Sequence, residues 1–189
     1  ELQDGGLIEA RVIMLDGRLG PVCEQLVGIG RNNWKISASS QQEGMTPAMA
    51  IDGDVKTMWF SARGEKEAPK HPHHLQIDLG SIKDVGGFSY LTRQDWKRWG
   101  GRRNRQFYIN PEGLIDTWKV EGSADGKKWT MIAKGEFGNL KNSPDNRTVM
   151  FEKPVRVCYF RFVSLHAVED KPFAAVAELE LLPSLKEQN

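Results

Sequence analysis

Short runs of β-forming residues recur along most of this sequence, and their recurrence constrains the fold more than any other feature. Gly, Pro, Asn and Asp separate the runs, and no segment keeps a 3.6-residue apolar period over about a dozen residues. The runs span residues 7–14, 34–38, 74–79, 85–91, 117–122, 129–134, 147–151, 157–164 and 177–182. Many short strands about ten residues apart predict an all-β fold, an antiparallel sandwich or jelly roll.

Composition and charge exclude several classes of function. The chain has 189 residues, 39% of them hydrophobic, which is enough for a full core. Its 26 basic and 25 acidic side chains give a net charge of +1, which argues against the broad positive surface of a nucleic-acid binder. No stretch approaches the roughly 18 uninterrupted apolar residues of a spanning helix, so we expect no membrane insertion. We expect a monomer.

Residues 1–31 differ from the rest of the chain. They form two predicted strands around the turn Asp16-Gly17, followed by a short link at residues 28–30. Two strands cannot bury an apolar face of their own. We therefore expect residues 1–31 to be the last strands of a preceding small β domain plus a linker. The main domain would span 32–183, followed by a polar tail at 184–189.

The two cysteines, Cys23 and Cys158, have no second cysteine or histidine at metal-ligand spacing. Zinc-ribbon and CxxC redox sites are therefore unsupported. Both residues sit in apolar runs, which favours two buried thiols. One long-range disulfide is the alternative.

Six segments together resemble the discoidin, or factor V/VIII type C, family, and within it the bacterial carbohydrate-binding module family 32. They lie in the order and spacing typical of that family, at residues 50–59, 71–80, 87–95, 120–129, 159–163 and 171–179. The resemblance implies an antiparallel eight-stranded jelly roll. Residues 1–31 more loosely resemble the last strands of the small β domain that precedes such modules in secreted bacterial glycosidases.

The same resemblance implies a function without catalysis. The domain would bind glycans, of galactose type or related and including acidic sugars, and would target a parent glycoside hydrolase in the same chain. Its setting would be secreted, periplasmic or at the surface of a bacterial cell. The alternative is a protein or membrane interaction module or a spacer domain, since eukaryotic relatives present exposed apolar residues to phospholipid or receptors.

An acidic turn precedes the first tryptophan of the recognised region. Asp52-Gly53-Asp54 followed by Thr57 gathers carboxylates, a hydroxyl and carbonyls in one loop, an all-oxygen environment that suits calcium. Such turns are also common without a metal. The family resemblance favours a structural calcium and implies the ligands Met49, Asp52, Asp54, Thr57, Ala177 and Glu178.

The family's sugar site combines aromatic rings, which stack on an apolar sugar face, with Arg, His and Glu, which bond to hydroxyls. The resemblance implies that Glu43, Arg93 and Phe173 fill three of these positions. Phe60 stands where His is usual, and Arg63 stands where a second aromatic is usual. The absence of that His argues against strict galactose specificity.

A basic segment follows Arg93 and contains Trp96 and Trp99. One interpretation is a long solvated loop whose tryptophans pack on the domain or on a neighbour. Another is a ligand platform, in which Trp96 or Trp99 replaces the missing aromatic and Arg98 or Arg102 meets a hydroxyl, carboxylate or sulfate. A protein contact is a third, and nucleic-acid binding is disfavoured by the charge balance.

The remaining tryptophans and histidines have structural interpretations. Alternating strand positions predict a core role for four tryptophans, Trp34, Trp59, Trp118 and Trp129. His73 and His74 begin a strand and must point to opposite faces, so with His71 they are expected to be structural or surface residues. His166 and Glu169 precede Phe173 and are expected to border the ligand face.

Overall fold

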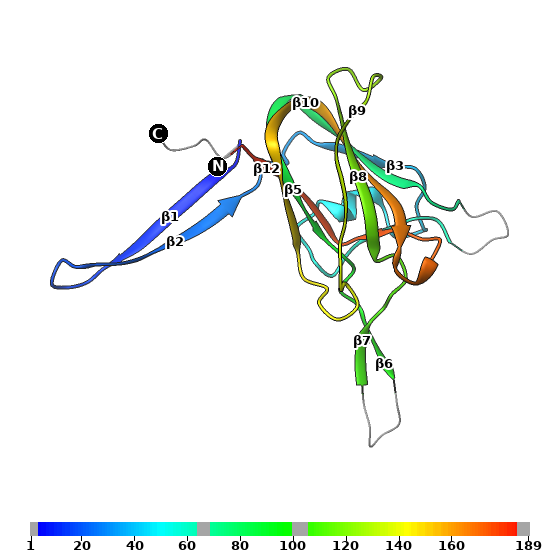
Figure 1. The fold of residues 1–189 in the computed structure, drawn as a ribbon, viewed down its shortest axis with the longest axis horizontal. Coiled ribbons are helices and arrows are strands. Elements are labelled where there is room, and N and C mark those ends of the chain that lie inside the picture. Colours follow the sequence, from blue (N-terminus) through cyan, green and yellow to red (C-terminus); the bar gives the residue numbers. More distant parts are fainter. Residues whose placement is uncertain (1–3, 64–68, 100–105, 185–189) are drawn as a thin grey trace.

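The computed structural model describes residues 4–63, 69–99 and 106–184. Its main body is an antiparallel β-sandwich (Figure 1), which confirms the predicted fold class. The strands pair in the order β12-β5-β10-β8-β9, and β3 pairs with β5. Their bounds are β3 Lys35–Ala38, β5 His73–Leu91, β8 Ile115–Ser123, β9 Thr130–Glu136, β10 Arg147–Ala167 and β12 Glu178–Pro183. In the part of the chain that is described, no helix is long and apolar enough to cross a membrane.

Strands β5 and β10 are long and shared by both layers of the sandwich. The first half of β5 pairs with Tyr159–Ser164 of β10, and its second half pairs with Arg147–Met150. On β10, strand β8 pairs with the second half only, and on β5, strand β12 pairs with the second half only. The sequence pattern predicted two shorter strands in the place of each of these long strands. Counting the halves separately gives the eight strands expected of a jelly roll.

The bend in this pair has a local cause. Gly80 has φ +73°, which favours glycine, and the register shifts between Val157 and Tyr159 on the facing strand. On one side of the bend the burial of β5 alternates, with Leu75 and Ile77 buried and Gln76 facing outward. The bend therefore directs apolar side chains of both halves into one core.

Aromatic side chains fill much of that core. Phe88, on β5, is fully buried and contacts the rings of four other aromatic residues. Trp59 and Trp118 are buried as predicted, and Trp34 packs against the core. The core role predicted for Trp129 is wrong. Its ring lies 3.7 Å from the Arg161 guanidinium on the outer face of the sheet, where this cation–π contact covers it.

Short elements connect the sandwich strands. Strand β4 (Trp59–Phe60) pairs with β11 (Ala175–Val176), and two 3-10 turns, η1 (Pro47–Ala50) and η2 (Val168–Asp170), flank them. His73 is buried while His74 faces outward, so the two histidines do point to opposite faces.

The described residues on either side of 100–105 form two paired strands. Strand β6 (Trp96–Trp99) pairs with β7 (Gln106–Ile109), and the hairpin projects from the sandwich (Figure 1). The side chains of Trp96, Arg98 and Trp99, together with Arg102, lie outside the described part of the structure. Their predicted ligand role stays a prediction.

A second hairpin extends from a different side of the domain. Strand β1 (Gly6–Ile13) pairs with β2 (Leu19–Val27), and both lie away from the sandwich (Figure 1). Cys23 on β2 is exposed and Cys158 is half-buried, and both are free thiols. The prediction of two buried thiols is therefore wrong for Cys23, because nothing in the described structure covers this hairpin.

The segment after the hairpin runs beside the last strand. The Ile29 N–H donates to the Leu181 carbonyl over 2.8 Å. Arg31 forms ion pairs with Glu178 at 2.7 Å and with Glu180 at 3.5 Å. The start of the sandwich is thereby fixed to β12.

Candidate functional site

The pairing of β4 with β11 brings two predicted site residues together. Phe60 lies opposite Ala175 in the register, and the Phe60 and Phe173 ring centres are 5.7 Å apart. Reciprocal bonds lock the strands, since the Ser61 N–H donates to the Ala174 carbonyl and the Ala174 N–H donates to Ser61 Oγ. Phe173 is half-buried at the rim of this pair.

Phe60 is not available to a ligand. Its ring is fully buried, because the Arg63 guanidinium lies 4.2 Å from its centre and Phe173 packs beside it. The prediction that Phe60 contacts a ligand is therefore wrong. Its role is to support Arg63, whose guanidinium also lies 5.6 Å from the Phe173 ring centre.

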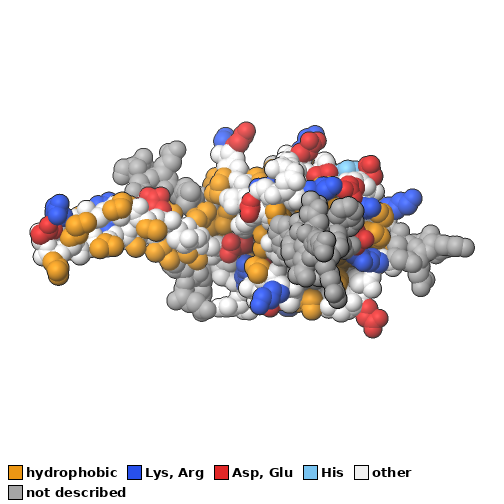
Figure 2. Space-filling view, turned by 90° about the horizontal axis from the view of Figure 1, so that it is seen from below, with side chains coloured by type: hydrophobic (Ala, Val, Ile, Leu, Met, Phe, Trp, Pro, Cys, Tyr) orange, Lys and Arg blue, Asp and Glu red, His pale blue; other side chains and the backbone are white. Residues whose placement is uncertain are grey.

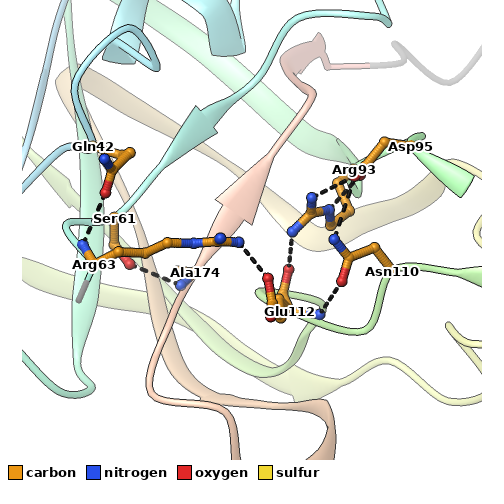
Figure 3. Close-up of polar contacts among 8 residues, drawn as sticks. All are labelled: Gln42, Ser61, Arg63, Arg93, Asp95, Asn110, Glu112 and Ala174. Carbon is orange, nitrogen blue, oxygen red and sulfur yellow. Dashed lines mark hydrogen bonds and ion pairs between the residues drawn. The ribbon is translucent and has the colours of Figure 1, made fainter. Parts of the chain in front are cut away.

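Arg93 lies beneath the site with only 5% of its side chain exposed. Its guanidinium forms an ion pair with Asp95, including an Nη2–Oδ2 contact of 2.6 Å, and donates to the Glu112 carbonyl over 2.7 Å (Figure 3). Burial opposes ionisation of Asp95, but the bonds from Arg93 outweigh it and hold the pKa of this carboxyl below its ordinary value. Arg93 thus organises the site from below and offers little surface to a ligand.

Two further residues of the site were not predicted from the sequence. The Glu112 carboxylate pairs with Arg63, and the Asn110 side-chain amide donates to Asp95 over 3.3 Å (Figure 3). Both belong to the turn Asn110-Pro111-Glu112-Gly113, in which Gly113 has φ +86°. The composition of this turn is a sequence signal, but it gives no indication that the turn meets Arg63.

Glu43 lies at the tip of a neighbouring turn. The turn is closed by a 3.0 Å bond from the Met45 N–H to the Gln42 carbonyl, and the Gln42 N–H donates to the Phe60 carbonyl. The Arg63 N–H donates to the Gln42 side-chain oxygen over 3.2 Å. The exposed Glu43 carboxylate is therefore attached to the same group of loops.

These contacts describe a shallow polar surface with one aromatic edge. Arg63 and Glu112 expose 37% and 28% of their side chains, and Phe173 contributes part of its ring. The two arginines are matched by Asp95 and Glu112, and Glu43 adds another acid nearby. Such a surface can hydrogen-bond hydroxyl groups and support one apolar ligand face.

The predicted calcium ligands also converge. The Thr57 hydroxyl lies 2.8 Å from Asp52 Oδ2, 3.0 Å from the Asp54 carbonyl oxygen and 3.4 Å from that of Met49. One hydroxyl can donate to only one of these oxygens at a time. The remaining oxygens form a donor set that fits a hard cation such as calcium.

Glu178 on β12 reaches the same loop. Its Oε1 accepts the Gly53 N–H at 2.7 Å, and its Oε2 pairs with Arg31. Ala177 is buried beside it. The Asp54 carboxylate accepts the Lys56 N–H at 3.0 Å, and it is the Asp54 carbonyl that faces the Thr57 hydroxyl. Among the described residues no three His, Cys, Asp or Glu side chains gather as a metal site, so a cation here would depend largely on carbonyl oxygens.

Comparisons with known proteins agree with this architecture. Residues 35–179 match the family model described as the F5/8 type C domain. A galactose oxidase of Gibberella zeae is 30% identical over 154 residues, which cover 81% of this chain and 20% of that protein. The chain therefore spans about a fifth of the length of this relative.

Solved structures share the fold. A family 32 carbohydrate-binding module from a family 31 glycoside hydrolase of Clostridium perfringens superposes with a TM-score of 0.69 at 23% identity, covering 83% of this chain and 95% of the module. The family 32 module of C. perfringens NanJ, solved in complex with galactose, gives a TM-score of 0.63 at 22% identity and covers 78% and 92%.

Proposed function

Because the chain belongs to the F5/8 type C domain family, we propose that it is a non-catalytic carbohydrate-binding module that attaches a parent glycoside hydrolase to glycans. The observation that carries this proposal is the half-buried Phe173 ring beside the exposed Arg63–Glu112 pair. A sugar's apolar face would rest on Phe173, and its vicinal hydroxyls would bond to the guanidinium and the carboxylate. We further propose that the protein acts outside the cell, secreted, in the periplasm or at a bacterial surface, where a glycan-targeting module would meet its ligand.

The charges of the site favour a neutral sugar over an acidic one. Arg63 is paired with Glu112 and Arg93 with Asp95, so neither guanidinium is left with an unbalanced positive charge. Glu43 would repel a uronic acid. The galactose complex of the NanJ module supports a hexose of galactose type as the first candidate. Retention by several such weak sites would raise the local concentration of the parent enzyme.

Sugar binding is expected to be weak and to depend on Phe173. In calorimetric or saturation-transfer titrations with galactose, N-acetylgalactosamine, N-acetylglucosamine, fucose and glucuronic acid, we expect at least one neutral sugar to bind with a Kd near 1 mM. Phe173→Ala should lower that affinity about fivefold, because an aromatic contact contributes about 1 kcal/mol.

Trp129→Ala is the matched control, since Trp129 is a half-buried aromatic on the outer sheet face and should leave affinity unchanged. The proposal fails if none of the five sugars binds, or if Phe173→Ala and Trp129→Ala weaken binding equally.

We also propose that a structural calcium ion occupies the loop around Thr57, held by the Met49 and Asp54 carbonyls, the Asp52 carboxylate and the Thr57 hydroxyl. Glu178 would join from β12. When bound, the ion would neutralise the carboxylates of the site and link the loop to β12, and it would take no part in a reaction. The convergence of four oxygen atoms within one loop supports this proposal.

The β1–β2 hairpin carries a separate proposal about the parent protein. Most of its large apolar side chains are exposed, and apolar side chains lie along this arm in Figure 2. They are Leu7, Ile8, Val12, Ile13, Met14, Leu15, Leu19 and Val22. An isolated hairpin is marginally stable in water. We propose that it packs against a preceding β domain of the same polypeptide, in line with a relative about four times as long.

Hydrogen exchange of this chain tests that proposal. We expect the β1 and β2 amides to exchange about as fast as unfolded segments, while those of β5 and β10 stay protected. Adding the preceding domain in the same polypeptide should slow exchange in the hairpin alone. Strong protection of β1 and β2 in the present chain would show that the hairpin needs no partner.

A further inference from the structure

The loop that carries Phe173 has an unfavourable backbone. Within η2, Glu169 has φ +62° and Asp170 has φ +53°, a left-handed conformation that residues other than glycine rarely adopt. Two successive residues of this kind persist only where their surroundings hold them. Hydrogen bonds from backbone N–H groups secure the two ends, from Val168 to the Leu114 carbonyl and from Ala174 to the Ser61 side-chain hydroxyl. Residues 170–172 lie between these anchors.

Three imidazoles hold those three consecutive residues. His166 Nε2 lies 2.9 Å from Asp170 Oδ1, His71 Nε2 lies 3.0 Å from the Lys171 carbonyl, and His73 Nε2 lies 2.8 Å from the Pro172 carbonyl. The rings also pack together, with the His71 ring centre 4.8 Å from that of His73 and 6.5 Å from that of His166. The set of His71, His73 and His166 is here called the histidine clamp.

Geometry assigns the protons of two members. A carbonyl can only accept, so His71 and His73 must each donate from Nε2. His71 Nδ1 lies 3.1 Å from Ser164 Oγ and 3.4 Å from the Ser164 carbonyl oxygen. Burial lowers the pKa of His73, whose Nδ1 is buried without a hydrogen-bond partner. His73 therefore acts in the neutral form.

His166 needs the charged form. Its Nδ1 lies 2.7 Å from Asp116 Oδ1 on β8, and its Nε2 faces Asp170 on η2. Two carboxylates can be satisfied together only when both ring nitrogens carry protons. The hydrogen bonds that His166 donates to Asp170 and Asp116 raise the pKa of His166. The other groups around it are the His71 ring and the nearby Lys141–Glu169 ion pair.

We propose that the histidine clamp positions Phe173 for glycan binding, and that loss of the His166 proton releases the Asp170 end of the loop. The inference rests on the proposed sugar contact at Phe173. A neutral His166 can donate to one aspartate only, and its unprotonated nitrogen then repels the other. The interaction is complete at mildly acidic pH, above the ordinary pKa of the two aspartates, and is lost as pH rises through the raised pKa of His166.

The expected change is modest because His166 is partly exposed and Asp170 almost fully exposed. We expect the affinity for a neutral sugar to fall about threefold between pH 5.5 and pH 8.5, as for loss of one solvent-exposed ion pair. His166→Gln removes the titration and should give a flat pH profile. His74→Gln is the matched control, because His74 lies on the outer face of β5 and should leave the profile unchanged.

A readout without ligand separates this inference from the proposed function. In NMR spectra of the free protein, the backbone amide signals of Asp170, Lys171 and Phe173 should titrate with His166 in the wild type and not in His166→Gln. If no sugar binds but these signals titrate, the clamp stands and the glycan proposal fails. If sugar binds with the same affinity across the pH range and the signals do not follow His166, the clamp is overturned.

Discussion

Phe88→Ala is expected to lower the free energy of unfolding by about 3–5 kcal/mol, the range for removing a buried aromatic side chain. The Phe88 ring centre lies 5.1 Å from that of Trp118, 5.6 Å from Phe162 and 6.2 Å from both Phe151 and Phe160. The neighbouring strands β10 and β12 both pair with β5 at this residue. The cavity would therefore lie where several elements meet, and strand pairing would limit its collapse.

Urea unfolding followed by fluorescence measures this change. Met131→Ala provides the comparison, because Met131 is 55% exposed on β9 and its loss should change stability by no more than about 0.5 kcal/mol. The loss of unfolding free energy for Phe88→Leu should lie between the losses for Phe88→Ala and Met131→Ala. A loss below 1 kcal/mol for Phe88→Ala would show that the core rearranges around this position.

Addition of calcium is expected to have the second large effect on the stability of the folded protein. If the ion binds only the folded chain, a concentration 100 times its Kd stabilises the protein by about 2.7 kcal/mol, and 1,000 times Kd by about 4.1 kcal/mol. The melting temperature should rise on adding calcium and return on adding a chelator. The cause is ligation of the Asp52 carboxylate and the surrounding carbonyls, which are otherwise grouped around one hydroxyl.

Two variants make the calcium test specific. Thr57→Val removes the central hydroxyl and should abolish most of the calcium-dependent rise. Asp16→Asn alters a different Asp-Gly turn, Asp16-Gly17, where the carboxylate bonds only Arg18 among the described residues, and should leave the rise intact. A melting temperature unaffected by calcium in the wild type, or an equal rise in both variants, would contradict the proposed site.

The fold was predictable from local sequence because alternation and turn residues define strands without reference to their partners. The same pattern divided β5 and β10 into four strands, since glycine and charged residues at a bend look like a turn in sequence. Trp129 and Cys23 were misplaced for a related reason. Apolar neighbours along the chain do not reveal whether anything covers them in space.

The site was only partly predictable. Arg63, Arg93 and Phe173 do lie together, but the burial of Phe60 arises from the guanidinium that packs over it. Glu112 was missed because its partner Arg63 lies far away in the sequence and no short motif links them. Calcium binding, the secreted setting and the targeting role stay predictions.

The attachment of Ile29 to β12 has a consequence for engineering. The sandwich begins beside the strand on which it ends, because residues 29–31 bond to Glu178 and Leu181. A polypeptide whose two ends are neighbours can be spliced into a surface turn of a host protein without stretching that turn. The stretch from Ile29 to Pro183 is therefore suitable for insertion into an unrelated host protein. It is also suitable for circular permutation, in which the two original ends are joined and new termini are opened at another turn.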